Sequence, residues 1–96
     1  MNLNKLRDLC YEMAKEKGFW DAEDNTAIKL MLIVSELGEA CEADRHEDYD
    51  NFREEIADTF IRLLDLCGHL NIDIEYEIDK KMSVNKKRPK LHGKKY

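Results

Sequence analysis

The sequence predicts an all-α protein of four helices packed as a bundle. Two observations support this fold class. Only one proline is present, Pro89, and no segment shows the sustained period-two alternation that would indicate strands between turn signals. Apolar residues instead recur at helical spacing along most of the chain. Ninety-six residues are enough for one small domain, so we expect a single domain over 1–96, with 90–96 as a basic C-terminal tail.

The first helix is predicted over residues 2–17, where Leu3, Leu6, Cys10 and Met13 form one apolar stripe. Gly18 follows at the position where a glycine commonly ends a helix. Residues 19–21 then form an aromatic loop, and Asp24 or Asn25 is expected to cap the next helix.

The second helix, predicted over 26–45, is apolar on two sides. One side carries the stripe Leu30, Ile33, Val34, Leu37 and Cys41, and the other carries Ile28, Leu32, Glu36, Glu39 and Ala43. A helix that is apolar all round is usually buried all round. Glu36 and Glu39 interrupt the second apolar stripe, so they need a metal ion, a basic partner or a proton.

The third helix is predicted from about Asn51 to His69, with the core stripe Phe52, Ile56, Phe60, Leu63 and Cys67. The fourth is expected to begin with Asp73 as its N-cap and to end before Pro89, because the residue before a proline avoids helical geometry. The last residues, 90–96, are predicted to form a loose tail.

Composition excludes several classes of protein. Charged residues make up 39% and hydrophobic residues 43%, and the longest apolar run, 30–34, is far too short to span a membrane. No apolar signal region precedes the first helix, so we expect a cytoplasmic protein without membrane contact. The three cysteines are widely spaced, which favours reduced core residues over disulfides or a zinc site.

The net charge of −5 is distributed unevenly. Residues 80–96 contain eight lysines and arginines and no acid, while all 21 acidic residues lie before them. A basic segment behind an acidic body fits nucleic-acid binding or counter-charges for a bound polyphosphate. Composition leaves both interpretations open.

Two pairs of carboxylates are the main candidates for a functional site. Glu36 and Glu39 form one pair and Glu55 and Asp58 the other, each with the i,i+3 spacing that places both side chains on one helix face. Two such helices side by side would bring four oxygen ligands together. An all-oxygen set favours Mg²⁺, Mn²⁺ or Ca²⁺ over iron or zinc, and the Glu-x-x-His pattern of di-iron bundles is absent. Of these ions we expect Mg²⁺, with Mn²⁺ as a substitute. Taken alone, Glu55 and Asp58 could also be ordinary surface acids, with Asp58 paired to Arg62.

Mg²⁺ bound by carboxylates commonly completes its shell with water and substrate phosphates. A polyphosphate substrate also requires cations. Lys81, Asn85 and Arg88 share one face near the end of the fourth helix at i, i+4 and i+7, although a solvated basic face would have the same pattern.

Three segments, taken in order, resemble the MazG-type all-α nucleoside triphosphate pyrophosphohydrolases: Ser35-Glu-Leu-Gly-Glu-Ala40, Glu54-Glu-Ile-Ala-Asp58 and Lys81-Met-Ser-Val-Asn-Lys-Lys-Arg-Pro89. The resemblance covers about residues 19–96. It implies hydrolysis of a (d)NTP to the monophosphate and pyrophosphate with Mg²⁺. It also implies assembly into homodimers or homotetramers, which would cover the doubly apolar second helix.

The resemblance also assigns roles to individual residues. Glu36, Glu39, Glu55 and Asp58 would be the metal ligands, and Glu39 would in addition orient or deprotonate the attacking water. The phosphates would be held by Lys81, Asn85 and Arg88, and Trp20 would stack on the base, although it could equally fix its loop to the core.

Two other hypotheses remain at this stage. A non-catalytic helical module could use its basic tail to bind nucleic acid or an acidic partner, which we consider the less favoured reading. A purely structural oligomer with solvated acids would explain the same composition.

Overall fold

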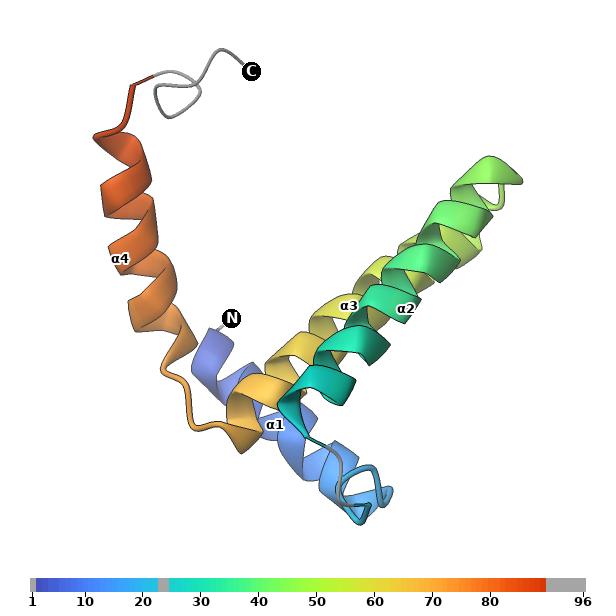
Figure 1. The fold of residues 1–96 in the computed structure, drawn as a ribbon, viewed down its shortest axis with the longest axis horizontal. Helices are drawn as coiled ribbons and strands as arrows, with labels where there is room; N and C mark the ends of the chain where they lie inside the picture. Colours follow the sequence, from blue (N-terminus) through green and yellow to red (C-terminus); the bar gives the residue numbers. More distant parts are fainter. Residues whose placement is uncertain (1, 23–24, 90–96) are drawn as a thin grey trace.

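The computed structural model describes residues 2–22 and 25–89, and this part of the chain is all-α (Figure 1). The four helices are α1 (Leu3–Glu16), α2 (Thr26–Arg45), α3 (Tyr49–His69) and α4 (Ile74–Lys86). The predicted fold class is therefore confirmed as four helices packed together. The predicted tail at 90–96 and the alternative cap Asp24 lie outside the described residues.

The helix ends follow local capping chemistry. Asn25 and Asp73 cap α2 and α4 as predicted, each side chain accepting a hydrogen bond from a backbone N–H of the first turn. Gly18 adopts a φ of +80° just beyond α1, a conformation that glycine takes without strain. α3 begins two residues earlier than predicted, because Asp48 accepts a hydrogen bond from the Asn51 N–H and so caps the helix at Tyr49.

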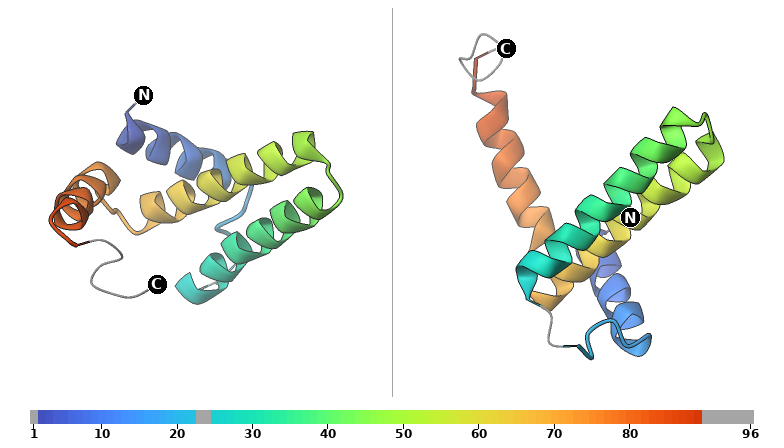
Figure 2. Two further views of the ribbon diagram at one scale, coloured as in Figure 1. Left: turned by 90° about the horizontal axis from the view of Figure 1, so that it is seen from above. Right: turned by 45° about the vertical axis from the view of Figure 1, so that its right-hand side comes forward.

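The helix pair α2–α3 is the central unit of the fold. The two helices are joined by a short turn and lie side by side as an antiparallel hairpin, and α1 packs against α3 (Figures 1 and 2). A Cβ atom on Gly68 would lie 2.6 Å from Tyr11 Cβ. A glycine is therefore required at this crossing of α1 and α3.

α4 packs mainly against the start of α1 and diverges from the α2–α3 hairpin (Figure 1). The junction is held by polar contacts. Asn4 Nδ2 donates to Asp73 Oδ1 at 2.9 Å, and Arg7 Nη1 donates to the carbonyl of Ile72 at 2.6 Å. The chain is consequently extended, with a radius of gyration of 15.9 Å against about 12.5 Å for a compact domain of this length.

The core is small and lies where α3 meets its two neighbours. Its buried apolar residues among those described are Cys10, Ala14, Ile33, Ala40, Ala43, Leu64, Leu66 and Cys67. Cys10 and Cys67 confirm the prediction of reduced core cysteines, whereas Cys41 is exposed. None of the described helices is long and apolar enough to cross a bilayer.

The predicted core stripes of α2 and α3 are only partly buried. Ile33 is buried, but Val34 is 53% exposed and Leu37 47% exposed, and Phe60 on α3 is 62% exposed. The physical reason is that α2 uses its Ala40–Ala43 side against α3, because small residues allow the two helices to approach closely. The larger side chains are left on an uncovered side of the hairpin.

Candidate metal centre

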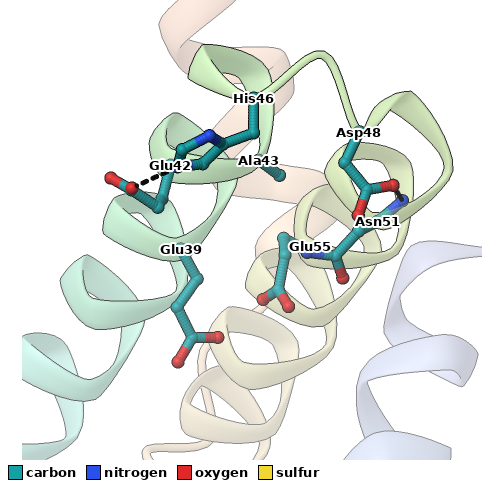
Figure 3. Close-up of a pocket in the computed structure, with 7 residues that line it drawn as sticks. All are labelled: Glu39, Glu42, Ala43, His46, Asp48, Asn51 and Glu55. Carbon is teal, nitrogen blue, oxygen red and sulfur yellow. Dashed lines mark hydrogen bonds and ion pairs between the residues drawn. The ribbon is translucent and has the colours of Figure 1, made fainter.

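Three glutamates meet between the two helices of the hairpin. Glu36 and Glu39 extend from α2 and Glu55 from α3, and one carboxylate oxygen of each lies within 4.8 Å of the others. Figure 3 shows Glu39 and Glu55 directed into the space between these helices. We call Glu36, Glu39 and Glu55 the three-glutamate cluster. The structure thus brings together three of the four predicted metal ligands.

The three carboxylates of the cluster lie close enough to shift one another's pKa values. A proton shared with Glu36 relieves repulsion between the carboxylates, and together with burial it raises the pKa of Glu55 to about 7. The same hydrogen bond from Glu55, followed by the Arg62 guanidinium, lowers the pKa of Glu36. One oxygen of Glu55, Oε2, is shielded from solvent and has no hydrogen-bond partner among the described groups. A divalent cation would satisfy this oxygen, so the donor set fits Mg²⁺ or Mn²⁺.

Arg62 lies beside the three-glutamate cluster, although its spacing along α3 had suggested a different partner. Its Nε donates to Glu36 Oε1 at 2.8 Å, and the Glu36 side chain is only 13% exposed. Arg62 therefore pairs across the hairpin with Glu36, rather than along α3 with Asp58 as the i,i+4 spacing had suggested. Helix spacing identifies neighbours within α3 but carries no information about the helix opposite.

Asp58, the fourth predicted ligand, lies outside the three-glutamate cluster. It is exposed and lines a cavity of about 270 Å³ between α1, α3 and the loop after α1, together with Cys10, Met13, Lys17, Phe19 and Asp65. The i,i+3 step from Glu55 to Asp58 turns the second carboxylate partly away from α2. The two predicted pairs therefore contribute unequally, since both Glu36 and Glu39 reach the cluster whereas only Glu55 of the second pair does.

A second cavity, of about 280 Å³, opens next to the cluster toward the tip of the hairpin (Figure 3). It is bounded by Glu39 and Glu55 at one end and by His46, Asp48 and Asn51 at the other. His46 Nε2 lies 2.8 Å from Glu42 Oε1, one helical turn earlier. These tip residues were not predicted to belong to a site, although the i,i+4 spacing of Glu42 and His46 is visible in the sequence.

Trp20 belongs to an aromatic cluster beside the hairpin. Its Nε1 donates to Asp65 Oδ1 at 2.7 Å, and its ring stacks on His69 with centroids 3.8 Å apart. The Lys29 ammonium also lies over the indole, 4.4 Å from the ring centre. Burial, partly opposed by the Trp20 hydrogen bond, raises the pKa of Asp65. Trp20 is therefore already engaged by protein groups at the position where base stacking was expected.

The predicted phosphate-binding residues lie on or just beyond α4. Lys81 and Asn85 are within the helix, Arg88 follows its last turn, and all three are exposed. Because α4 diverges from the hairpin (Figure 1), these residues stand apart from the three-glutamate cluster within one chain.

Comparisons of the chain with protein-family models, with curated proteins and with solved structures found no match.

Proposed function

We propose that this protein is a Mg²⁺-dependent nucleoside triphosphate pyrophosphohydrolase, which converts a (d)NTP to the monophosphate and pyrophosphate. The observation that carries the proposal is the convergence of Glu36, Glu39 and Glu55 from two helices, with carboxylate oxygens within 4.8 Å of one another. The resemblance of the three sequence segments to the MazG-type enzymes supports the same activity.

Each glutamate has a distinct part in this proposal. Glu36, held by Arg62, and Glu55, whose Oε2 lacks a partner, would hold the metal from opposite helices. Glu39 is exposed at the mouth of the adjacent cavity, so it is the carboxylate best placed to bind and deprotonate a water molecule. Asp58 would add a ligand only after its side chain reorients. Mg²⁺, when bound, neutralises charge on phosphate oxygens and lowers the pKa of coordinated water.

The triphosphate also requires positive charge, which we assign to Lys81 and Arg88, with Asn85 as a hydrogen-bond donor. Since α4 stands apart from the cluster, either α4 closes on the substrate or these residues serve a neighbouring copy. The cavities beside the hairpin would accommodate the nucleoside.

The direct test is pyrophosphate release from a panel of (d)NTPs with Mg²⁺. Glu39→Gln should lower the turnover number by at least about 100-fold, the usual contribution of a general base, while circular dichroism remains unchanged. Glu54→Gln is the matched control, because Glu54 is an exposed glutamate next to the cluster that takes no part in it. Full activity in Glu39→Gln would show that Glu39 does not deprotonate the attacking water.

A second variant separates phosphate binding from metal binding. Lys81→Ala should raise KM for the nucleotide about tenfold, because one charge-assisted contact is lost, and should leave Mg²⁺ binding to the nucleotide-free protein unchanged. No pyrophosphate from any nucleotide in the panel would refute the proposed activity. In that case gel shifts at rising salt would test the alternative of a nucleic-acid-binding module.

A further inference from the structure

The cavity of about 270 Å³ between α1, α3 and the loop after α1 combines an apolar lining with a few charged groups. Met13, Phe19 and Ile61 contribute apolar side chains, and Asp65 contributes a carboxylate. Pockets for small molecules have this composition, because the hydrophobic lining holds the ligand and the polar groups orient it. The volume lies just below about 300 Å³, the lower end of the usual range. The cavity therefore suits a flat ring system rather than a whole nucleotide.

This cavity adjoins the metal centre through Arg62. The Arg62 side chain lines the cavity, and its Nε donates to Glu36 of the three-glutamate cluster at 2.8 Å. Asp65 lies one turn farther along α3. At about 1.5 Å of rise per residue, Asp65 is about 5 Å from Arg62 and about 15 Å from Glu55 along the helix axis. A nucleotide whose phosphates lie at the cluster would therefore have its base at the cavity.

Asp65 is held in position and still has capacity to accept hydrogen bonds. Its Oδ1 accepts a hydrogen bond from Trp20 Nε1 at 2.7 Å, and a carboxylate has about four acceptor sites in all. Trp20 itself stacks on His69 and has the Lys29 ammonium over its ring. The indole therefore fixes the orientation of the carboxylate, and a ligand in the cavity can donate a hydrogen bond to the same carboxylate.

We propose that this cavity holds the base of the substrate and that Asp65 accepts a hydrogen bond from an exocyclic amino group of that base, as cytosine and adenine carry. This inference rests on the proposed pyrophosphohydrolase activity and extends it to base preference. Phe19, which is 52% exposed and lines the cavity, packs on the face of the base, because base–aromatic stacking is favourable for every base.

The preference follows from the chemistry of the carboxylate. Uracil and hypoxanthine carry a carbonyl oxygen where cytosine and adenine carry the amino group. A carbonyl oxygen that faces the Asp65 carboxylate places two acceptors together with no proton between them. Asp65 is partly buried, and a partly buried polar group that loses its partner costs about 1–3 kcal/mol. Since 1.4 kcal/mol corresponds to a factor of about ten, we expect at least about tenfold discrimination.

The test compares two pairs of nucleotides that differ in this group, CTP with UTP and ATP with ITP. We measure kcat/KM for pyrophosphate release with Mg²⁺ and expect the wild type to prefer the amino-bearing member of a pair at least about tenfold. The pair that shows the preference identifies the base. Because burial raises the pKa of Asp65, the assay is run at about pH 8, which favours the ionised carboxylate.

Asp65→Asn is the decisive variant. Its amide oxygen can still accept the hydrogen bond from Trp20, and its amide N–H can donate to a carbonyl oxygen in the cavity. The preference should therefore disappear or turn toward the carbonyl-bearing nucleotide, a ratio that partial loss of folded protein does not change. Asp44→Asn is the matched control, because Asp44 is an exposed aspartate of α2 near the tip of the hairpin, and it should keep the wild-type ratio.

Binding of the monophosphates CMP, UMP, AMP and IMP, measured by calorimetry, separates this inference from the proposed activity. Equal kcat/KM within both pairs, or a preference that Asp65→Asn leaves unchanged, would overturn the role of Asp65 while the pyrophosphohydrolase activity stands. If no nucleotide is hydrolysed but an amino-bearing monophosphate binds preferentially and Asp65→Asn removes that preference, the base site stands and the activity is refuted. Absence of hydrolysis together with absent or equal monophosphate binding would overturn both.

Discussion

Binding of Mg²⁺ to the three-glutamate cluster should release a proton in a pH-dependent manner. The proton resides on Glu55, whose pKa is raised to about 7 by hydrogen bonding with Glu36 and by burial. A metal ligand must be deprotonated, so binding displaces this proton. From that pKa, about 0.9 proton should be released per metal bound at pH 6, about 0.5 at pH 7 and about 0.1 at pH 8. Apparent affinity should weaken about tenfold between pH 8 and pH 6.

Isothermal titration calorimetry in buffers of different ionisation enthalpy measures the released protons directly. The perturbation is Glu55→Gln, which keeps the side-chain shape and removes the titrating group. In this variant proton release should vanish at every pH and Mg²⁺ affinity should fall. Glu54→Gln should behave as the wild type. Proton release that is constant from pH 6 to pH 8, or that persists in Glu55→Gln, would refute the assignment of the proton to Glu55.

The same shift predicts how stability of the metal-free protein depends on pH. The pKa of Glu55 rises on folding from 4.5 to about 7, so between these values the native state binds more protons than the unfolded state. Its contribution to stability is complete below pH 4.5 and is lost as the pH rises through 7. Thermal melts without metal should therefore show Tm falling over this range, and saturating Mg²⁺ should raise Tm most at the upper end. A Tm of the metal-free protein that rises between pH 5 and pH 7 would contradict the raised pKa of Glu55.

Two further predictions concern packing around the hairpin. Gly68→Ala should destabilise the protein by about 1–3 kcal/mol, because the added Cβ would lie 2.6 Å from Tyr11. Gly38→Ala, where the Cβ meets nothing within 4 Å, should stabilise the protein by about 0.5–1 kcal/mol through helix propensity. Urea unfolding measures both variants, and equal changes in the free energy of unfolding would contradict the close crossing of α1 and α3 at Gly68. Trp20→Phe should cost about 1 kcal/mol, since Asp65 loses the 2.7 Å hydrogen bond from the indole, and an unchanged unfolding midpoint would count against that bond.

Local signals determined the helices themselves. Asn25, Gly18 and Asp73 act through hydrogen bonds and backbone angles within a few residues of the chain, so the sequence predicted where these helices begin and end. Asp48 was not predicted as a cap, because the apolar stripe of this helix begins only at Phe52 and the residues between them, such as Tyr49 and Asp50, do not belong to it. The sequence also predicted that Glu36 and Glu39 differ from ordinary surface acids, because they interrupt an apolar stripe.

The sequence by itself determined an all-α chain of four helices and the carboxylates from which a metal centre could be built. Only the tertiary structure decided which of them meet. Hydrophobic periodicity shows that α2 is apolar on two sides but does not say which side α3 covers. The small residues Ala40 and Ala43 let α3 pack closely against the side of α2 that bears Glu36. This packing brings Glu55 into the cluster and pairs Arg62 with Glu36. It also left Asp58 outside the cluster and the larger apolar side chains uncovered, because a helix can turn only one of its faces toward a single neighbour.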